Sequence, residues 1–482
     1  MKRTALILMA AFLAAGCTGV PKVWDSCGQL PSMTPDYSNV VIPRNIAPMN
    51  FIIDTPGDRF VTVLKSDACE TVLRGRTVKI PMRRWRRLLE SDSISINVFV
   101  QRDGQWIRMK EFSMTASDPI DRYVTYRLIP PSFQQYEDIS ICQRDLENFG
   151  EKAIYRNMAV MKPARGQGQC VNCHSFQNYG TESFQLHLRQ YEGGTVIVHD
   201  GKVRKVNLKR SQTAVSTAVY PSWHPFLPLV AYSTNSTVQY FHTSHPDRVE
   251  VFDDASDLVL YNVETDVLTP VLTTPDRLEC FPSWSQDGRT LYYVQAVHDI
   301  PDGEDRHRYT LSQTDSIRYD IYAMPFNTAT MEWGAPYRVF NASAAGCSAT
   351  HPRLSPDGRR LMFSLGSHGI FHVWHNDADL WMLDMASGQA RAIEELNSDR
   401  SESYHSWSHD GRWVIFGSRR EDGEYTRLFI SHLQPDGTFS KPFTIPQKDP
   451  HSNSMRVYSY NIPEFTTERV KYGPRRLLRA MR

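Results

Sequence analysis

The sequence lacks the features that would place it in a common enzyme or membrane class. Beyond the N-terminus it has no apolar run long enough to cross a bilayer, and it has no G-x-S-x-G, H-E-x-x-H or glycine-rich nucleotide motif. Its 54 basic and 53 acidic side chains leave a net charge of +1, which does not support a general nucleic-acid-binding role. We therefore expect a globular chain of two or three domains that acts as a carrier or binding scaffold, and whether it is an enzyme stays open.

The first seventeen residues are typical of an export signal. Two basic residues precede an apolar run from Ala5 to Ala15, and small residues lead to Cys17. This ending resembles the cleavage box of bacterial lipoproteins, with the usual leucine one position early at Leu13. The resemblance implies a signal peptide over 1–17, lipidation of Cys17, and a chain that faces the periplasm and is anchored by lipid to a membrane of the cell envelope. An ordinary signal peptide with a chance cysteine is the alternative.

The N-terminal part alternates between apolar and polar residues. Residues 18–45 are rich in proline, serine and aspartate and are expected to form a linker. Over 46–130 we expect a β-sandwich-like domain, with a hairpin at Asp103-Gly104 and a strand at "RYVTYRLI". Residues 131–192 alternate less, and "ISICQRDLENFGE" and "ESFQLHLRQ" are expected to be helical or irregular. Basic clusters at 83–87 and in the tail 471–482 could contact anionic lipids or simply face solvent.

After residue 193 the chain is repetitive. Four stretches align, among them "YPSWHPFLPLVAYSTN" and "FPSWSQDGRTLYYVQA", with anchor residues spaced by 61, 70 and 53 positions: Trp223, Trp284, Leu354 and Trp407. Each repeat holds two hairpins, hence the four strands of a propeller blade. Over 193–470 we expect five blades, or six, with "GTVIVHDGKVRKVNL" and "MRVYSYNIPEF" combining to close the ring. The repeats resemble the WD40-like repeats of TolB-type propellers, which implies a mainly β fold.

The connections between the second and third strands of the repeats are long. They span about 234–256, 297–318 and 365–378, and in a propeller they all emerge on one face. They contain seven histidines: His242, His245, His298, His307, His368, His372 and His375. Such loops on a rigid scaffold could hold a metal ion or a substrate, or the histidines could be solvated decoration.

One C-x-x-C-H motif lies between the two β regions, at Cys170, Cys173 and His174. It is typical of covalent attachment of a single haem c, in which two thiols add to the haem vinyl groups and the adjacent histidine ligates the iron. A zinc site, a redox-active cysteine pair and a disulfide are the alternatives. We prefer His187 as the second axial ligand. The other candidates for that position are Met158, Met161 and His199.

The remaining cysteines are odd in number. Without Cys17 and the two of the motif, five of the eight are left, so at least one is free or pairs between chains. Cys280 and Cys347 occupy similar positions before adjacent repeats, and they are a candidate disulfide in an oxidising compartment.

The order of these parts resembles a group of exported, Bacteroidetes-type lipoproteins in which a short cytochrome c-like segment precedes a TolB-like propeller. The segments "CVNCHSF", "FQLHLR", "GGTVI" and "YPSWHP" carry this resemblance. It implies haem binding and a propeller scaffold. The sequence then favours a lipid-anchored monohaem cytochrome c that exchanges electrons with a protein partner docked on the propeller face. The alternatives are a protein- or glycan-binding scaffold with a structural or sensory haem, and an enzyme at the histidine-rich face or at an open haem.

Overall fold

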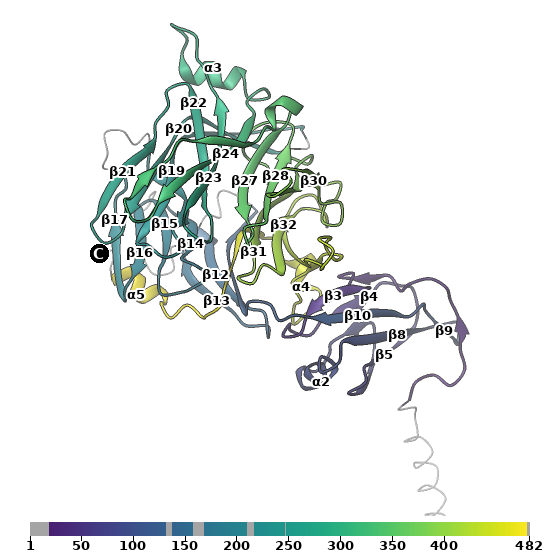
Figure 1. Cartoon of the computed structure of the whole chain (residues 1–482). Coiled ribbons are helices and arrows are strands. Elements are labelled where there is room, and N and C mark those ends of the chain that lie inside the picture. Colours follow the sequence, from purple (N-terminus) through teal and green to yellow (C-terminus); the bar gives the residue numbers. More distant parts are fainter. Residues whose placement is uncertain (1–18, 132–136, 158–167, 210–215, 246, 480–482) are drawn as a thin grey trace, which may run out of the picture. The chain divides into compact units, whose positions relative to one another are not determined.

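The structure is a computed structural model that describes residues 19–131, 137–157, 168–209, 216–245 and 247–479 (Figure 1). The chain divides into two compact units, one of residues 1–118 with 446–455 and the other of residues 119–445 with 456–482. In both, the regular secondary structure is mostly strand, which confirms the expected mainly β class. Among the described residues, no helix is long and apolar enough to span a bilayer.

The first unit is built from two sheets. The larger has the strand order β1-β9-β8-β10-β3, with β5 pairing β8 and β6 pairing β5, and the smaller has the order β2-β4-β7. Phe51 of the smaller sheet packs edge-on against Phe112 of the larger, with ring centroids 6.5 Å apart. The elements are β1 (Asp25–Ser26), β2 (Met33–Thr34), β3 (Val40–Pro43), β4 (Phe51–Ile53), β5 (Arg59–Lys65), β6 (Glu70–Arg74), β7 (Thr77–Val78), α2 (Met82–Leu88), β8 (Ser93–Arg102), β9 (Gln105–Arg108), β10 (Phe112–Ser117) and α4 (Ser452–Met455).

Three features expected from the sequence lie in this unit: a hairpin, a linker and a basic cluster. The hairpin at Asp103-Gly104 is present between β8 and β9, and both turn residues have positive φ. Residues 18–45 are not a linker, because they supply β1, β2 and β3, each paired with a strand of the unit. The basic cluster at 83–87 lies on helix α2, where the four arginines are exposed and Trp85 is buried.

The second unit is a propeller of six antiparallel blades. In ring order these are β35-β11-β12-β13, β14–β17, β18–β21, β22–β26, β27–β30 and β31–β34. The third and fourth blades are also joined by one parallel bridge, between Ser256 and Leu278. The first three blades comprise β11 (Tyr123–Ile129), β12 (Ser140–Asp145), β13 (Glu151–Arg156), β35 (Ser459–Thr466), β14 (Gln169–Phe176), β15 (Phe184–Gln190), β16 (Gly194–His199), β17 (Lys202–Val206), β18 (Ala218–Trp223), β19 (Leu229–Phe241), β20 (Val249–Asn262) and β21 (Val267–Leu272).

The other three blades follow without interruption along the chain. Their elements are β22 (Arg277–Trp284), β23 (Thr290–Val297), α3 (Arg306–Ser312), β24 (Tyr319–Asn327), β25 (Glu332–Trp333), β26 (Tyr337–Phe340), η2 (Ser343–Ala345), β27 (Ser348–Leu354), β28 (Arg360–Gly366), β29 (Asp379–Asp384), β30 (Ala390–Ala392), β31 (Glu402–Trp407), β32 (Trp413–Ser418), β33 (Arg427–His432) and β34 (Phe443–Thr444). Helix α5 (Pro474–Arg479) comes last, and its Leu477 and Leu478 are buried in the core beside β14 and β15.

The inner strands form a closed ring. β14 contacts β18, β18 contacts β22, β22 contacts β27, β27 contacts β31, β31 contacts β35, and β35 returns to β14. Because β35 pairs with β11, the last blade combines one C-terminal strand with three earlier ones, β11 to β13. The number of blades is therefore six. The expected closing partner of β35 was wrong, since "GTVIVHDGKVRKVNL" forms β16 and β17, which complete the blade of β14.

The propeller also begins earlier in the chain than expected. Its first strand, β11, lies inside the stretch assigned to the sandwich, and residues 131–192 are not a separate segment, because β12 to β15 belong to two blades. The expectation of helical or irregular structure there was wrong for a physical reason. All but the last residue of β12 and the first five residues of β15 are buried. A strand covered on both faces loses the alternation by which strands are recognised in a sequence.

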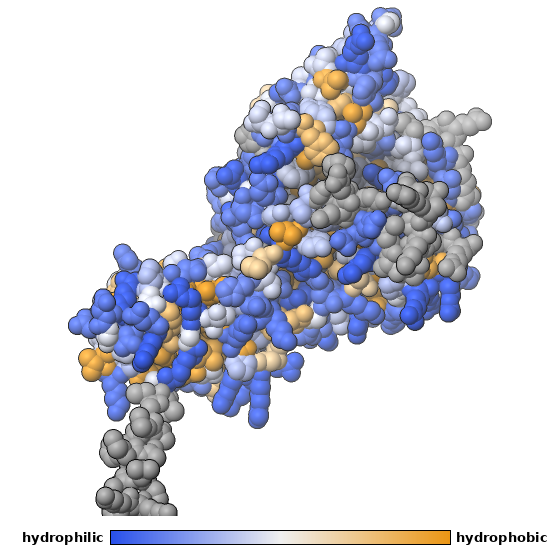
Figure 2. All heavy atoms as spheres, turned by 180° about the vertical axis from the view of Figure 1, so that it is seen from behind, coloured by the Kyte–Doolittle hydropathy of each residue, from blue (hydrophilic) through white to orange (hydrophobic). Residues whose placement is uncertain are grey.

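The surface drawn in Figure 2 is mainly hydrophilic, with apolar residues in small groups. This is the usual distribution for a folded domain in water. The enclosed spaces of the propeller are therefore better candidate sites than this surface.

Candidate functional site: the central cavity

All six inner strands carry the same backbone irregularity. At one place in each, the pairing with the neighbouring strand shifts register, as in a β-bulge. The residue at the bulge has a positive φ between 30° and 55° in every case, although none is a glycine: Cys173, Tyr220, Phe281, His351, Tyr404 and Ile462. Such conformations are costly for large side chains and cluster at functional sites, so a ring of six points to one.

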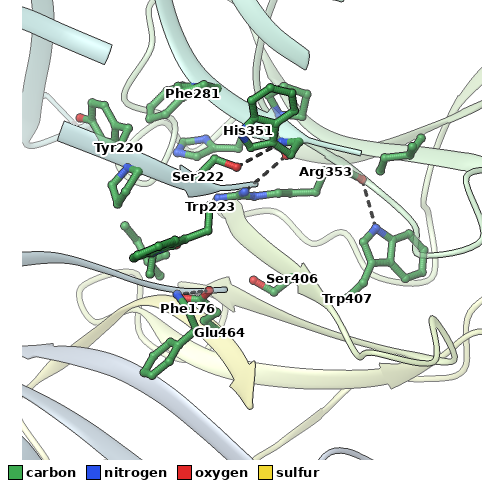
Figure 3. Close-up of a pocket in the computed structure, with 18 of the residues that line it drawn as sticks. Phe176, Tyr220, Ser222, Trp223, Phe281, His351, Arg353, Ser406, Trp407 and Glu464 are labelled. Carbon is green, nitrogen blue, oxygen red and sulfur yellow. Dashed lines mark hydrogen bonds between the residues drawn. The ribbon is translucent and has the colours of Figure 1, made fainter. Parts of the chain in front are cut away.

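The bulges direct side chains towards the propeller axis, where they line a cavity of about 160 Å³. Each inner strand contributes residues from the bulge to its third following position. The cavity is also lined by Asn178 and Tyr179, which follow β14, and by Ser285 and Gln286, which follow β22. It therefore lies at the end of the propeller where first strands connect to second strands. Figure 3 shows residues that line the cavity.

Aromatic rings form much of the cavity wall. All four anchor residues of the sequence repeats line the cavity, three of them tryptophans: Trp223, Trp284, Trp407 and Leu354. The structure adds two equivalent residues that the sequence alignment missed, Phe176 and Phe465. The Trp407 indole donates a hydrogen bond of 3.1 Å to the Arg353 carbonyl, which joins two neighbouring blades at the wall (Figure 3).

Two charged residues reach the cavity, Arg353 from β27 and Glu464 from β35 (Figure 3). The Arg353 guanidinium donates to the Ser283 hydroxyl at 3.4 Å, and no ion pair links it to a carboxylate among the described residues. Burial lowers the pKa of Arg353, but an arginine remains charged in proteins.

The pKa of Glu464 is far from that of an ordinary carboxyl group. Burial raises its pKa to about 8, although the Phe176 backbone N–H, 2.9 Å away, and the charge of Arg353 both act in the opposite direction. At neutral pH its carboxyl group is therefore mostly protonated. The cavity then carries a net positive charge from Arg353, together with a carboxyl group that can donate a hydrogen bond.

The structure places the residues of the C-x-x-C-H motif on the inner strand β14. Cys173 and His174 line the cavity, but Cys170 does not, and its sulfur lies 3.2 Å from the Asn172 side-chain nitrogen. Cys173-His174-Ser175-Phe176 occupies the same place in its blade as Tyr404-His405-Ser406-Trp407. Comparison of "CHSF" with "YHSW" could have shown this from the sequence.

The other expected ligands are dispersed. His187 lies on β15, where its Nδ1 is 3.1 Å from the Thr195 hydroxyl, and it does not line the cavity. His199 contacts the Ser183 hydroxyl at 2.9 Å. Cys17, Met158 and Met161 lie outside the described residues.

The described residues do not fit a haem as they stand. Attachment requires both thiols and the histidine at one cavity wall, whereas Cys170 is elsewhere. The His174 side chain is only 1% exposed, and burial lowers its pKa to about 3. The cavity of about 160 Å³ is also smaller than the ~300–1,000 Å³ of most ligand pockets. Haem attachment at this motif therefore stays a prediction that would require β14 to rearrange.

The candidate disulfide between Cys280 and Cys347 is not formed. All seven described cysteines have free thiols. The Cys280 sulfur lies 3.4 Å from the Ser233 hydroxyl and 3.3 Å from the Asn235 side-chain nitrogen, on β19. Cys280 lies within β22, whereas Cys347 directly precedes β27, so the similar position that the sequence repeats suggest is not kept in the structure.

Comparisons with known proteins bear on the fold alone. No protein-family model matches the chain, and no curated protein matches it. Among solved structures, it is similar to TolB from Acinetobacter baumannii, with 13% identity, a TM-score of 0.43, and 77% of this chain and 78% of the other covered. It is also similar to a structure described as a TolB of Agrobacterium tumefaciens, with 15% identity, a TM-score of 0.39, and coverage of 71% and 98%. A nidogen/laminin complex gives 7% identity, a TM-score of 0.39, and coverage of 72% and 100%.

Proposed function

We propose that the propeller is a binding module for a protein partner and that its central cavity takes a carboxylate-bearing segment of that partner. The observation that carries this proposal is Arg353, a cation without a carboxylate partner among the described residues, at the wall of an aromatic cavity. Arg353 is half-buried, and a charge with little access to water is costly unless it is paired, so the site favours an anionic ligand group.

The cavity has a suitable group for each part of such a ligand. The Arg353 guanidinium can hold a carboxylate with two parallel hydrogen bonds. The protonated Glu464 can donate a further hydrogen bond, as an ionised carboxylate could not. The tryptophans of the wall offer flat apolar surfaces to neighbouring side chains, and Trp and Arg are the residue types that most often dominate binding energy at protein interfaces.

Peptide libraries would test the proposal directly. N-acetylated peptides with randomised last four residues are prepared with a free C-terminal carboxylate and as C-terminal amides, and binding to the full chain is measured by fluorescence polarisation. We expect the tightest binders to carry a carboxylate, at the C-terminus or in a side chain. Loss of a charged hydrogen bond of about 1.5–3 kcal/mol should weaken them by roughly 10- to 100-fold in Arg353→Gln.

The matched control is Arg359→Gln, which removes the same charge from an exposed residue outside the cavity. It should leave peptide affinity unchanged. If the best binders lack a carboxylate, or if Arg353→Gln binds them as well as the wild type, the cavity does not recognise this group.

A monohaem cytochrome c is the second candidate function, because Cys173 and His174 do line the cavity, although β14 would have to rearrange to bring Cys170 beside them. A bound haem would supply a one-electron redox couple. Expression with the cytochrome c maturation system, followed by a pyridine haemochrome spectrum, tests this candidate. Covalent haem that is lost in Cys170→Ala and Cys173→Ala would support it, whereas a folded, haem-free product would exclude it.

We also propose that the chain is exported and anchored by lipid at Cys17, as the sequence predicts. Metabolic labelling with a radioactive fatty acid should mark the wild type and not Cys17→Ser. An unlabelled protein would leave an ordinary signal peptide as the better interpretation.

A further inference from the structure

Several long connections between second and third strands meet at the end of the propeller opposite the central cavity. Glu250 lies near the start of β20, and His368 and His375 lie in the loop between β28 and β29, two blades further on. Backbone contacts hold this loop in place. The Gly369 N–H donates to the Ile317 carbonyl at 2.9 Å, and the Asn376 N–H donates to the Asp247 carboxylate at 2.9 Å.

Both imidazoles direct the same ring nitrogen at one carboxylate oxygen. The His375 Nε2 is 2.9 Å from Glu250 Oε2, and the His368 Nε2 is 3.8 Å from that same oxygen. One nitrogen or oxygen atom from each of the three residues lies within 4.8 Å of the other two. With metal bonds of about 2.0–2.2 Å, tetrahedral zinc separates its ligand atoms by roughly 3.3 Å. The three atoms therefore need to move by no more than about 1–1.5 Å to share one ion.

The surroundings already orient these side chains. The His368 Nδ1 lies 2.8 Å from the Ser367 hydroxyl, which leaves Nε2 directed at the carboxylate. The other oxygen of Glu250 accepts the Val251 N–H at 3.0 Å. Outer contacts of this kind hold ligands in natural metal sites. Gly369 has a φ of +67°, and a Cβ there would lie 3.2 Å from His375 Cε1 and 3.6 Å from Glu250 Oε1, so the loop passes close against both ligands.

An ion pair with Glu250 accounts for only one of the two imidazoles that face its carboxylate. The His375 side chain is fully buried and that of Glu250 is 6% exposed, while the two imidazole rings stack with centroids 4.7 Å apart. Two protonated imidazoles so close together would repel each other. Two neutral imidazoles and one carboxylate are instead a typical ligand set for zinc with one coordination position left open.

We propose that Glu250, His368 and His375 bind one divalent transition-metal ion, with zinc the best match to this ligand set, and that the ion joins β20 to the loop between β28 and β29. The fourth position is open to water, because His368 is partly exposed. The carboxylate of Asp315, 3.9 Å from His368 Nε2 and 92% exposed, is close enough to reach it. This site is independent of the central cavity and of the function proposed for it.

The test is zinc binding to the full chain. The protein is stripped with a chelator and dialysed, then titrated with Zn²⁺ against a chromophoric competitor, and the bound metal is counted by mass spectrometry. We expect one zinc per chain with sub-micromolar affinity. Glu250→Gln keeps the shape of the side chain and should weaken binding at least 100-fold while the circular dichroism spectrum is unchanged. His368→Ala with His375→Ala should abolish binding.

Two controls separate this site from other metal-binding groups in the chain. His242→Ala with His245→Ala removes a nearby histidine pair, whose ring centroids are 5.2 Å apart, and should bind zinc like the wild type. Cys170→Ser with Cys173→Ser should also bind normally. The proposal is wrong if the stripped wild type takes up no zinc, if Glu250→Gln binds it unchanged, or if the cysteine variant is the one that loses it.

Discussion

The Asp-Gly turns of three blades offer a graded test of how tightly the propeller is packed. Gly288, Gly358 and Gly411 have φ of +68°, +71° and +71°, so replacing each with alanine carries the same backbone cost, about 1–2 kcal/mol. Their surroundings differ. A Cβ at Gly358 meets nothing within 4 Å, one at Gly411 comes 3.2 Å from a Pro356 carbon, and one at Gly288 comes 2.4 Å from two ring atoms of His224.

His224 has little freedom to move away. Its ring is buried, its Nε2 lies 3.0 Å from the Gly288 carbonyl, and its Nδ1 accepts the Leu227 N–H at 3.0 Å. It also packs edge-on against Trp284, with centroids 4.8 Å apart. Displacing it loses two hydrogen bonds of about 1 kcal/mol each as well as packing. We therefore expect Gly288→Ala to cost about 3–5 kcal/mol, Gly358→Ala about 1–2 kcal/mol, and Gly411→Ala an intermediate amount.

Equilibrium denaturation followed by tryptophan fluorescence would measure this series. Gly358→Ala is the matched control for the turn itself. Combining Gly288→Ala with His224→Ala removes the ring from the path of the new methyl group, so the double variant should cost less than the sum of the single ones. Equal losses in Gly288→Ala and Gly358→Ala would refute the close contact and the reasoning built on it.

Three further predictions concern the cavity and the ring. Because folding raises the pKa of Glu464 from its usual 4.5 to about 8, its contribution to stability is fully present below pH 4.5 and is lost as the pH rises through 8. Denaturation at pH 5, 6.5 and 8 should show a decline of about 3–4 kcal/mol that Glu464→Gln lacks. Trp407→Phe removes the hydrogen bond to the Arg353 carbonyl and should lower the free energy of unfolding by about 1 kcal/mol. It should also weaken the binding of carboxylate peptides several-fold, and an unchanged affinity would show that this bond does not position Arg353. A chain that ends before β35 should lose the cooperative unfolding of the propeller in calorimetry, and a retained transition would mean that five blades are stable alone.

The repeated pattern was enough to recognise the propeller, but not its extent. Three of the anchors, Trp284, Leu354 and Trp407, stand in strands followed by an Asp-Gly turn, and Trp223 is recognised by the repeated motif around it; these four blades form as expected. Phe176 and Phe465 occupy the same position, but β14 and β35 are not followed by an Asp-Gly turn. Buried strands such as β12 gave no alternation to detect.

The sites were predictable only in part. The seven histidines were expected on one face, and His368 and His375 do lie together there. Glu250 joins them because two blades pack against the same loop, and a sequence does not show such packing. The sequence does not mark Arg353 and Glu464 as site residues, because their position depends on the bulges. Each is the second residue after a bulge, and the bulge places it at the cavity. The C-x-x-C-H motif lies in an inner strand, a place that its likeness to "YHSW" indicates in the sequence and that the strand pairing shows directly.

The way the ring closes has a consequence for how the chain folds. Gln143 of β12 bonds to the Thr466 hydroxyl across a separation of 323 residues, and residues 446–455 return to the first unit, where the Asn50 side chain bonds to the Gln447 and Lys448 carbonyls. The first unit is not complete before residues 446–455 have been synthesised, and the propeller is not complete before β35. With contacts this distant in sequence, folding is expected to be slow, and β11 presents an unpaired strand edge until β35 arrives. The interval between synthesis and closure is therefore when the chain is most exposed to aggregation and most dependent on chaperones.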